Sequence, residues 1–330
     1  MIEKLRTTLT QSKKILITTH KSPDGDAIGS SVAWYHFLKV QGKEVLIVLP
    51  DEPADFLLPF LKDVDYLIYE KDASQIDASL PHFDLAFCLD YNSPSRVGKN
   101  MELMLGNIKY SKVMIDHHQN PVEFCEIVIS RPEICSTCQL IYECIEELGA
   151  KDFLNKSCCE AIYLGILTDT GSFRYPSVTA KTHLILAHLL EMGVEHFKIH
   201  EKIFDVNTLD KIQLRAYAIA NKFEKIPGLP IGLISLSSDE LQRFNYQKGD
   251  TEGLVNVILS IEGISIALFL MEAQDGIKMS FRSKGTYFVN DFAEKNFSGG
   301  GHKYAAGGFS TDSLNVTISR FKALVDELIP

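Results

Sequence analysis

The stretch ILITTHKSPDGDAIGSS, residues 15–31, contains the transition that decides the fold of the first half of the chain. Its first four residues, Ile15 to Thr18, form a short apolar and β-branched run that predicts a buried strand. Pro23 and Gly25 then predict a tight turn, and the segment from Ala27 to Val40 has a helical pattern. The stretch therefore predicts a strand that passes through a polar turn into a helix.

The same alternation continues downstream. Further strand-type runs are Val45–Val48, Leu85–Leu89 and Val113–Ile115. Continuous apolar strands separated by helical patterns imply a mainly parallel sheet covered by helices on both faces. Three of the strands end in polar residues, namely Thr19-His20, Asp90 and Asp116. Ligands of such sheets bind outside the carboxyl ends of the strands, so we expect the site there.

The second half of the chain has a different organisation. A helical pattern runs from Ala180 to about Lys222, Ile226–Pro230 breaks it, and a second series of strand and helix patterns starts at Ile231. At about 150 residues per domain, 330 residues suffice for two domains. We therefore expect an α/β protein with a large domain over 1–190, a helical connector over 191–222 and a smaller α/β domain over 223–330.

Composition narrows the class of protein. The chain has 33 basic and 43 acidic residues and a net charge of −10, which disfavours long duplex nucleic acid as a partner. The apolar run Ile264–Met271 is too short to cross a bilayer, and the N-terminal residues lack the apolar stretch of a signal peptide. We expect a cytoplasmic protein without a membrane partner.

The seven cysteines are an odd number without the spacing of a disulfide framework, which fits reduced thiols. Cys135 and Cys138 could form half of a zinc site, but no second pair stands at zinc-ribbon spacing. Buried thiols are the favoured interpretation.

Acids and histidines gather where the strands are expected to end. They are His20, Asp24 and Asp26 in the first turn, Asp90, the run Asp116-His117-His118, and Asp169 in Thr168-Asp169-Thr170-Gly171. Taken singly, Asp24 could be a turn residue, Asp26 a helix cap, and Asp90 or Asp169 a cap or turn residue. Several carboxylates in one crevice would repel one another unless cations lay between them, and these donors suit Mn²⁺, Mg²⁺ or Zn²⁺.

A glycine-rich segment, Ser298 to Gly308, lies in the second half. Its backbone N–H groups could bind an anion, although a flexible loop is the simpler alternative. Between Lys278 and Lys303 there are five basic and two acidic residues, against the negative charge of the whole chain. A local anion site explains this excess.

Together these residues resemble the DHH phosphoesterase family with its DHH-associated C-terminal domain, and within it the stand-alone oligoribonuclease (nanoRNase) and 3′-phosphoadenosine 5′-phosphate phosphatase branch. The motifs occur in the family's order over nearly the whole chain, from the His-x-x-x-Asp-x-Asp motif at His20 to the Gly-Gly-Gly-His motif ending at His302. The resemblance implies a hydrolase of the exonuclease type with two divalent cations, Mn²⁺ first and Mg²⁺ or Co²⁺ as alternatives.

The resemblance also implies a role for each motif residue. One metal would be held by His20, Asp24 and Asp90, and the other by Asp26, Asp90, His117 and Asp169. Asp116 would support this centre without being a ligand, and His118 would face the scissile phosphate. A second phosphate would be bound in the smaller domain by Arg282, Gly299, Gly300, Gly301 and His302.

The substrates that the resemblance implies are very short RNA oligonucleotides, degraded to mononucleotides, or nucleotide bisphosphates such as 3′-phosphoadenosine 5′-phosphate, converted to AMP. A cyclic-di-AMP or linear dinucleotide phosphodiesterase is the closest alternative, and a catalytically silent nucleotide-binding module is the alternative from another class. A soluble pyrophosphatase would need a more basic second domain. Both monomer and homodimer remain open.

Overall fold

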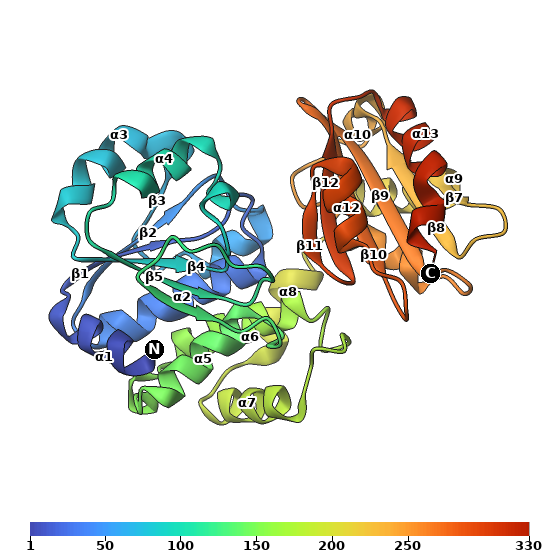
Figure 1. Cartoon of the computed structure of the whole chain (residues 1–330). Helices are drawn as coiled ribbons and strands as arrows, with labels where there is room; N and C mark the ends of the chain where they lie inside the picture. The colour runs from blue at the N-terminus through green and yellow to red at the C-terminus, as the bar shows by residue number, and fades with distance from the viewer. Residues whose placement is uncertain (330) are drawn as a thin grey trace. The chain divides into compact units, whose positions relative to one another are not determined.

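The chain divides into two compact units, Met1–Val206 and Asn207–Pro330, and the computed structural model describes residues 1–329. Each unit contains a six-stranded sheet flanked by helices (Figure 1). This confirms the expected fold class, a large parallel α/β unit followed by a smaller α/β unit. The division between the units falls within the expected connector, with α8 (His196–Phe204) in the first unit and α9 (Leu209–Lys222) in the second.

The sheet of the first unit has the strand order β3-β2-β1-β4-β5-β6, and all its neighbouring strands are parallel. The strands are β1 (Lys14–Thr18), β2 (Glu44–Leu49), β3 (Tyr66–Ile68), β4 (Leu85–Leu89), β5 (Ser111–Asp116) and β6 (Ile127–Ser130). Since β2 and β3 lie on one side of β1 and the later strands on the other, the order reverses between β1 and β4. Ligands of open α/β sheets bind at such a reversal, beyond the carboxyl ends of the strands.

Helices cover both faces of this sheet (Figure 1). Alternate residues of a strand point to opposite faces, so Ile15 and Ile17 enter one core and Leu16 enters the other. The first core contains α1 (Ile2–Gln11), α2 (Gly25–Val40), α5 (Thr137–Glu147), α6 (Lys156–Asp169), α7 (Ala180–Glu191) and α8. The second contains α3 (Tyr69–Ser79) and α4 (Lys99–Asn107). Short 3₁₀ helices occupy Asp55–Phe60, Leu80–His82, Pro94–Val97 and Lys151–Phe153.

Two glycines let α2 and α6 approach each other closely. A Cβ at Gly29 would lie 2.6 Å from the carbonyl oxygen of Ala161 in α6. A Cβ at Gly165 would lie 2.5 Å from Oδ1 of Asp26 and overlap the sulfur of Cys138. Such distances are shorter than real Cβ contacts, so a side chain at either position would force the helices apart.

The second unit has the strand order β11-β12-β10-β9-β8-β7. Its strands are β7 (Phe223–Lys225), β8 (Ile231–Leu236), β9 (Ile266–Ala273), β10 (Gly276–Ser283), β11 (Gly300–His302) and β12 (Ala305–Ser310). Only β8 and β9 pair in parallel among these strands. One core includes α12 (Asn290–Phe297) and α13 (Leu314–Leu324), and the other includes α9, α10 (Ser238–Arg243) and α11 (Leu254–Ser260). A 3₁₀ helix at Val325–Leu328 follows α13.

The glycine-rich segment forms an ordered hairpin of β11 and β12, where a flexible loop was the simpler expectation. Gly301 has a φ of 140°, and a Cβ there would lie 2.5 Å from the carbonyl oxygen of Ala305. A Cβ at Gly299 would overlap the carbonyl oxygen of Gly307. Gly299 and Gly301 are therefore required by the close pairing of the hairpin itself, whereas a Cβ at Gly300 would meet no atom within 4 Å.

Candidate metal centre

The turn after β1 is held by two aspartates. Asp24 caps α2, because its Oδ1 accepts two backbone N–H groups of the first turn at 3.0 Å each. Asp26 is therefore not the cap, and it lies buried in the first turn of the helix. Asp51, a buried residue after β2 that the sequence analysis did not single out, accepts the backbone N–H of Ser22 at 2.6 Å. The turn that presents His20 is thus fixed at both ends.

Asp90 immediately follows β4 and has a φ of 65°. Residues other than glycine rarely have a positive φ. Its backbone N–H donates to the carbonyl oxygen of Ile115 in β5 at 3.1 Å, which continues the pairing of the two strands. Such conformations are found preferentially at functional sites, where the surrounding structure maintains them. Since β1, β4 and β5 are adjacent, His20, Asp90 and Asp116 meet at one edge of the sheet.

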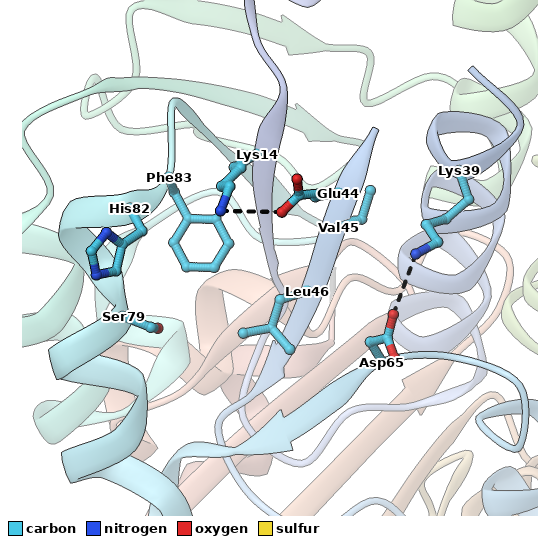
Figure 2. Close-up of a pocket in the computed structure, with 9 residues that line it drawn as sticks. All are labelled: Lys14, Lys39, Glu44, Val45, Leu46, Asp65, Ser79, His82 and Phe83. Atoms are coloured by element: carbon cyan, nitrogen blue, oxygen red, sulfur yellow. Dashed lines mark hydrogen bonds and ion pairs between the residues drawn. The ribbon is translucent and has the colours of Figure 1, made fainter. Parts of the chain in front are cut away.

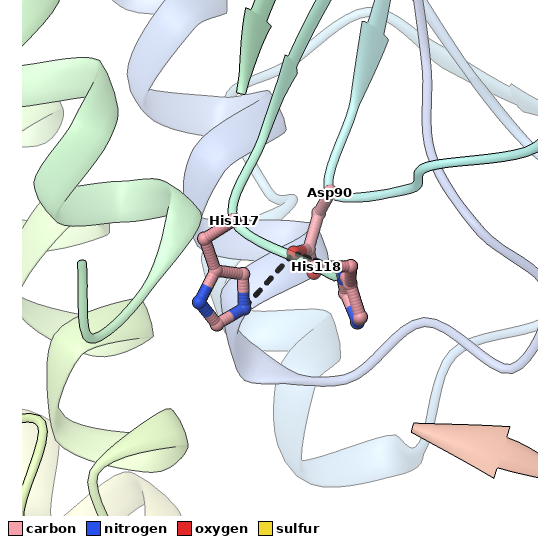
Figure 3. A group of neighbouring side chains, drawn as sticks. All are labelled: Asp90, His117 and His118. Atoms are coloured by element: carbon pink, nitrogen blue, oxygen red, sulfur yellow. Dashed lines mark ion pairs between the residues drawn. The ribbon is translucent and has the colours of Figure 1, made fainter. Parts of the chain in front are cut away.

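Asp90 stands between two groups of donor atoms. Its Oδ2 lies 3.4 Å from Nε2 of His20, which is also 3.8 Å from Oδ1 of Asp24. Its Oδ1 lies 3.8 Å from Nε2 of His117 (Figure 3). In each of the triads His20–Asp24–Asp90 and Asp90–His117–His118, one potential ligand atom per residue lies within 4.8 Å of the others.

His117 also connects Asp90 with two further carboxylates. Its Nε2 lies 3.8 Å from Oδ2 of Asp26 and 3.6 Å from Oδ2 of Asp169, the last residue of α6. On the other side of the ring, Nδ1 lies 3.1 Å from the carbonyl oxygen of Ile134. If Nδ1 carries the proton of the neutral ring, Nε2 presents its lone pair to the carboxylates, the arrangement in which histidines bind metals.

Asp116 determines the orientation of His118. Its Oδ1 lies 2.7 Å from Nδ1 of the His118 ring, and its Oδ2 accepts the backbone N–H of His118 at 3.0 Å. Burial is the largest influence on His118 and lowers the pKa of its ring to about 3, although the charge of Asp90 acts in the opposite direction. The ring is therefore neutral near pH 7, and its Nδ1–H donates to Asp116 while Nε2 is unprotonated.

The other titratable groups of the cluster respond to their mutual proximity. Burial would lower the pKa of His20, but its hydrogen bonds with Asp24 and Asp90 raise that pKa to about 10. Burial would also lower the pKa of His117, but the neighbouring carboxylates raise it to about 9. Burial and then the charges of nearby carboxylates raise the pKa of Asp26 well above its ordinary value. For these three groups the cluster favours positive charge or the loss of negative charge. Asp24 behaves in the opposite way, because burial would raise the pKa of its carboxyl but the hydrogen bond with His20 lowers that pKa well below its ordinary value.

This donor set fits divalent cations. Carboxylate oxygens and imidazole nitrogens are ligands of Mn²⁺, Mg²⁺ and Zn²⁺, and several of the carboxylates are buried beside one another. A cation would remove the repulsion that otherwise keeps protons on the cluster. All six predicted ligands are thus brought together, and His118 is itself a member of one triad, with Asp90 and His117.

The sequence analysis did not identify the N-terminus of α5 as part of this centre. The backbone N–H groups of Thr137 and Cys138 donate to the two carboxylate oxygens of Asp26 at 2.6 and 2.9 Å. The hydroxyl of Thr137 donates to Oδ1 of Asp90 at 2.8 Å. Ser136 and Gln139 at cap and N3 spacing are a helix-start signal that could have revealed this helix end.

The cysteines are mainly buried core residues. Cys138 contacts Asp26 through its backbone, and no group of three or more metal-binding side chains in residues 1–329 includes a cysteine. All seven thiols are free, and only Cys125 is less than fully buried. The half-zinc-site interpretation of Cys135 and Cys138 therefore finds no support in the described residues.

In the second unit, Arg282, Ala305 and His302 form a row across β10, β12 and β11. Directly paired residues point to the same face of a sheet, so Arg282 and His302 share a face. The preceding residue, Phe281, points the opposite way into the core with α12 and α13. The Nη1 of Arg282 donates to the carbonyl oxygen of Phe281 at 2.9 Å, while its buried Nε has no hydrogen-bond partner in residues 1–329.

The first unit also has a groove of about 400 Å³, and none of its lining residues belongs to the metal centre. Figure 2 shows the groove. It is lined by Lys14, Lys39, Glu44, Val45, Leu46, Asp65, Ser79, His82 and Phe83. Lys14 and Glu44 begin β1 and β2, so the groove lies at the amino ends of the strands. Both lysines are paired, Lys14 with Glu44 at 3.2 Å and Lys39 with Asp65 at 3.4 Å.

No helix within residues 1–329 combines the length and the apolar character needed to cross a membrane.

Comparison with known proteins agrees with the motifs. Residues 14–166 match the DHH family, N-terminal domain, and residues 233–329 match the DHHA1 domain. The chain is 31% identical over 294 residues to a Thermus thermophilus protein named bifunctional oligoribonuclease and PAP phosphatase NrnA, a match that covers 89% of this chain and 83% of that protein.

Two further relatives differ in their names. A crystal structure of an exopolyphosphatase-related protein from Bacteroides fragilis is 35% identical, with a TM-score of 0.93 over 99% of this chain and 95% of that one. The cyclic-di-AMP phosphodiesterase GdpP of Bacillus subtilis is 27% identical over 98% of this chain, but the match covers only 49% of its own length.

Proposed function

Because this chain belongs to the DHH family of phosphoesterases, we propose that it hydrolyses very short oligoribonucleotides to mononucleotides and 3′-phosphoadenosine 5′-phosphate to AMP. The observation that carries the proposal is the position of Asp90, whose two carboxylate oxygens face different histidines at 3.4 and 3.8 Å. That arrangement suits a pair of cations that share one ligand. The name of the Thermus thermophilus relative supports the substrate class.

We assign one cation to His20, Asp24 and Asp90, and the other to Asp26, Asp90, His117 and Asp169. Mn²⁺ is the first choice, with Mg²⁺ and Co²⁺ as alternatives, because the set combines hard carboxylate oxygens with imidazole nitrogens. Bound in this way, two cations would lower the pKa of a water molecule and neutralise charge on the phosphate.

The side chains around the cations would orient the reactants. Asp116 holds His118 in the form that carries its proton on Nδ1. The Nε2 of His118 can therefore accept a hydrogen bond or a proton from a group at the scissile phosphate. Thr137 holds the Oδ1 of Asp90, which keeps the shared carboxylate in place. No nucleophilic side chain is required.

We propose that Arg282, Gly299, Gly300, Gly301 and His302 bind a phosphate other than the scissile one. Arg282 and His302 share a face of the sheet, and a guanidinium can bind a phosphate through two parallel hydrogen bonds. A second phosphate contact would favour very short RNA and nucleotide bisphosphates. The net charge of −10 disfavours long duplexes.

A substrate panel with added Mn²⁺ tests the proposal. It contains dinucleotides to pentanucleotides, 3′-phosphoadenosine 5′-phosphate, cyclic-di-AMP, linear pApA and pyrophosphate. We expect the highest kcat/KM for the short RNAs or the bisphosphate, and loss of all activity with a chelator. Pyrophosphate as the preferred substrate, or activity that survives chelation, would overturn it.

A cyclic-di-AMP or pApA phosphodiesterase is the second candidate, favoured by the match of nearly the whole chain to GdpP. The same panel separates the two. A kcat/KM for cyclic-di-AMP above that for all linear substrates other than pApA would support the second candidate.

Substitution of Arg282 tests the phosphate site. Arg282→Ala should raise KM for short RNA and for 3′-phosphoadenosine 5′-phosphate by about ten- to hundredfold, the usual effect of a lost charged phosphate contact. Turnover of bis-p-nitrophenyl phosphate, which lacks a second phosphate, should persist. If generic and nucleotide substrates lose activity together, Arg282 serves the chemical step or the fold instead.

A further inference from the structure

Residues 131–138, which connect β6 with the first turn of α5, contact three of the proposed metal ligands. These ligands are Asp26, Asp90 and His117. The carbonyl oxygen of Ile134 lies 3.1 Å from Nδ1 of His117. Thr137 donates its backbone N–H to Asp26 and its hydroxyl to Asp90. The place of the 131–138 segment therefore influences where three ligands lie.

The same segment is joined to Glu143, which lies further along α5 and is buried. Its Oε2 accepts a hydrogen bond from Nη1 of Arg131, the first residue of the segment, at 3.1 Å. The Nζ of Lys181 in α7 lies 3.2 Å from the same oxygen. The other oxygen, Oε1, accepts a hydrogen bond from Nε2 of Gln139 at 2.9 Å. Both oxygens of this carboxylate therefore have partners, as the burial of a charged group requires.

Gln139 extends the network to the middle of the segment. Its Oε1 accepts hydrogen bonds from the thiol of Cys135 at 3.0 Å and from the hydroxyl of Thr182 in α7 at 2.8 Å. All three side chains are buried. Glu143 is thus connected to the segment directly at Arg131 and, through Gln139, at Cys135.

Arg131 has a second partner of a different kind. Its Nη2 donates to Oε1 of Glu147 at 2.5 Å, but the side chain of Glu147 is 37% exposed, against 6% for Glu143. Ion pairs that face solvent contribute little, whereas loss of one partner from a buried pair is strongly unfavourable. The contact with Glu143 is therefore the one expected to fix the guanidinium.

We propose that Glu143 is a positioning residue for the metal centre, acting through Arg131 and Gln139 on the 131–138 segment. In residues 1–329, none of its hydrogen bonds or ion pairs is with a proposed metal ligand. The inference rests on the proposed function and deepens it, because it extends the control of cation binding to a buried ion pair outside the centre. Residues that orient metal ligands in this way commonly change metal affinity by about 10- to 100-fold when they are replaced.

Titration of the metal-free full chain with Mn²⁺, followed by calorimetry, tests the proposal without relying on catalysis. Glu143→Gln keeps the size of the side chain but removes the charge that Arg131 and Lys181 share, so the affinity for Mn²⁺ should fall by about 10- to 100-fold. Glu146→Gln is the matched control, with the same chemical change in the same helix at a carboxylate that pairs with Lys151 at 2.8 Å. It should leave the affinity unchanged. A folded Glu143→Gln variant with the affinity of the wild type would overturn the proposal.

A second variant decides the matter if Glu143→Gln does not fold. Arg131→Gln leaves Glu143 with Lys181 and Gln139 as partners and should also weaken Mn²⁺ binding. Arg131→Lys, which keeps a positive charge for Glu143, should recover part of the affinity. Glu147→Gln removes only the exposed partner of Arg131 and should change little. Equal affinities in Arg131→Gln and the wild type would overturn the proposal.

Amide hydrogen exchange separates positioning from general stability. In metal-free Arg131→Gln, peptides that cover residues 131–138 should lose protection, because the segment opens locally, while peptides from β2 should keep theirs. Equal loss of protection in both sets of peptides would make the ion pair a general contributor to stability and would overturn the proposal.

Kinetics distinguish failure of this proposal from failure of the proposed function. At saturating Mn²⁺ the Glu143→Gln and Arg131→Gln variants should recover most of kcat with KM unchanged, because they act through the affinity for the cation. A kcat that stays low while Mn²⁺ affinity equals that of the wild type would overturn the positioning role. A wild-type chain that binds Mn²⁺ but hydrolyses nothing in the substrate panel would overturn the proposed function, and the titrations would still decide on Glu143.

Discussion

At the residue scale, Asp90 is closely constrained by its surroundings in the metal centre. It is 1% exposed, has a φ of 65°, and faces His20 with one carboxylate oxygen and His117 with the other. Thr137 donates a hydrogen bond to the oxygen on the His117 side. Loss of the negative charge of Asp90 would therefore change the electrostatic surroundings of both His20 and His117.

We expect Asp90→Asn to be the most damaging single substitution in the centre. The amide keeps the size of the side chain but removes the negative charge that both proposed cations share, so kcat should fall by about a hundredfold or more and bound Mn²⁺ should decrease. Turnover and metal content by mass spectrometry are the measurements. Asp152→Asn, at an exposed position, is the matched control and should leave both unchanged. Near-normal turnover of Asp90→Asn would show that Asp90 is not a shared ligand.

His117 and His118 are neighbours with different surroundings, so their loss should have different consequences. His117 faces three carboxylates through Nε2, whereas Nδ1 of His118 is bound by Asp116. His117→Ala should lower both bound Mn²⁺ and kcat. His118→Ala should lower kcat by about 10²–10⁴-fold, as expected for loss of a group that transfers or orients a proton, with metal content nearly intact. Equal loss of metal from the two variants would place His118 among the ligands.

At the scale of elements, three helices support one carboxylate. Asp26 lies in the first turn of α2, accepts two backbone N–H groups from the start of α5, and packs against Gly165 of α6. The positive end of the α5 dipole favours the ionised carboxylate, whereas burial opposes it. The position of one proposed ligand therefore depends on the spacing of whole helices.

Gly165→Ala tests this dependence. Alanine favours a helix over glycine by about 1 kcal/mol, but its Cβ would overlap Cys138 and lie 2.5 Å from Oδ1 of Asp26. We expect net destabilisation of about 1–3 kcal/mol, typical of overpacking, and at least tenfold weaker Mn²⁺ binding. Thermal unfolding and metal titration are the measurements.

Gly106→Ala is the control for that substitution. Gly106 lies in α4, and a Cβ there would meet no atom within 4 Å, so the change should be neutral or slightly stabilising and leave metal binding unchanged. Similar Mn²⁺ affinities in the two variants would mean that α6 does not position Asp26.

At the scale of the whole molecule, the chain contains two units with separate hydrophobic cores, and all six proposed metal ligands belong to the first. A cation that binds only the folded state stabilises that state by RT ln(1 + [L]/Kd). Its effect should therefore be confined to the unit that holds it.

Chelation should accordingly reduce stability in one unit only. At a Mn²⁺ concentration of 100 times Kd, binding contributes about 2.7 kcal/mol, and a chelator should remove this contribution from the first unit. Amide hydrogen exchange is the measurement. Peptides from α2 and β4 should lose protection, while peptides from β9 and β10 serve as the internal control and should not change. Equal loss in both units, or no loss in either, would contradict the assignment of the cations.

The sequence by itself determined the elements and the candidate residues. Apolar runs and helical periodicity are local, so β1, β4, β5 and the helix from residue 25 were predicted close to their observed limits. Strands buried on both faces have no polar alternation, which made the parallel sheet predictable. Acids and histidines directly after such strands indicated a site at the carboxyl edge, and the order of the motifs indicated the family.

Only the tertiary structure decided how these residues meet. The strand order β3-β2-β1-β4-β5-β6 places β4 beside β1, which brings Asp90 next to His20 across 70 positions of sequence. The same holds for the α5 backbone at Asp26, for Asp51 at the His20 turn, and for the row of Arg282 and His302. These contacts are long-range and depend on strand order and helix spacing, for which local propensity and periodicity carry no signal.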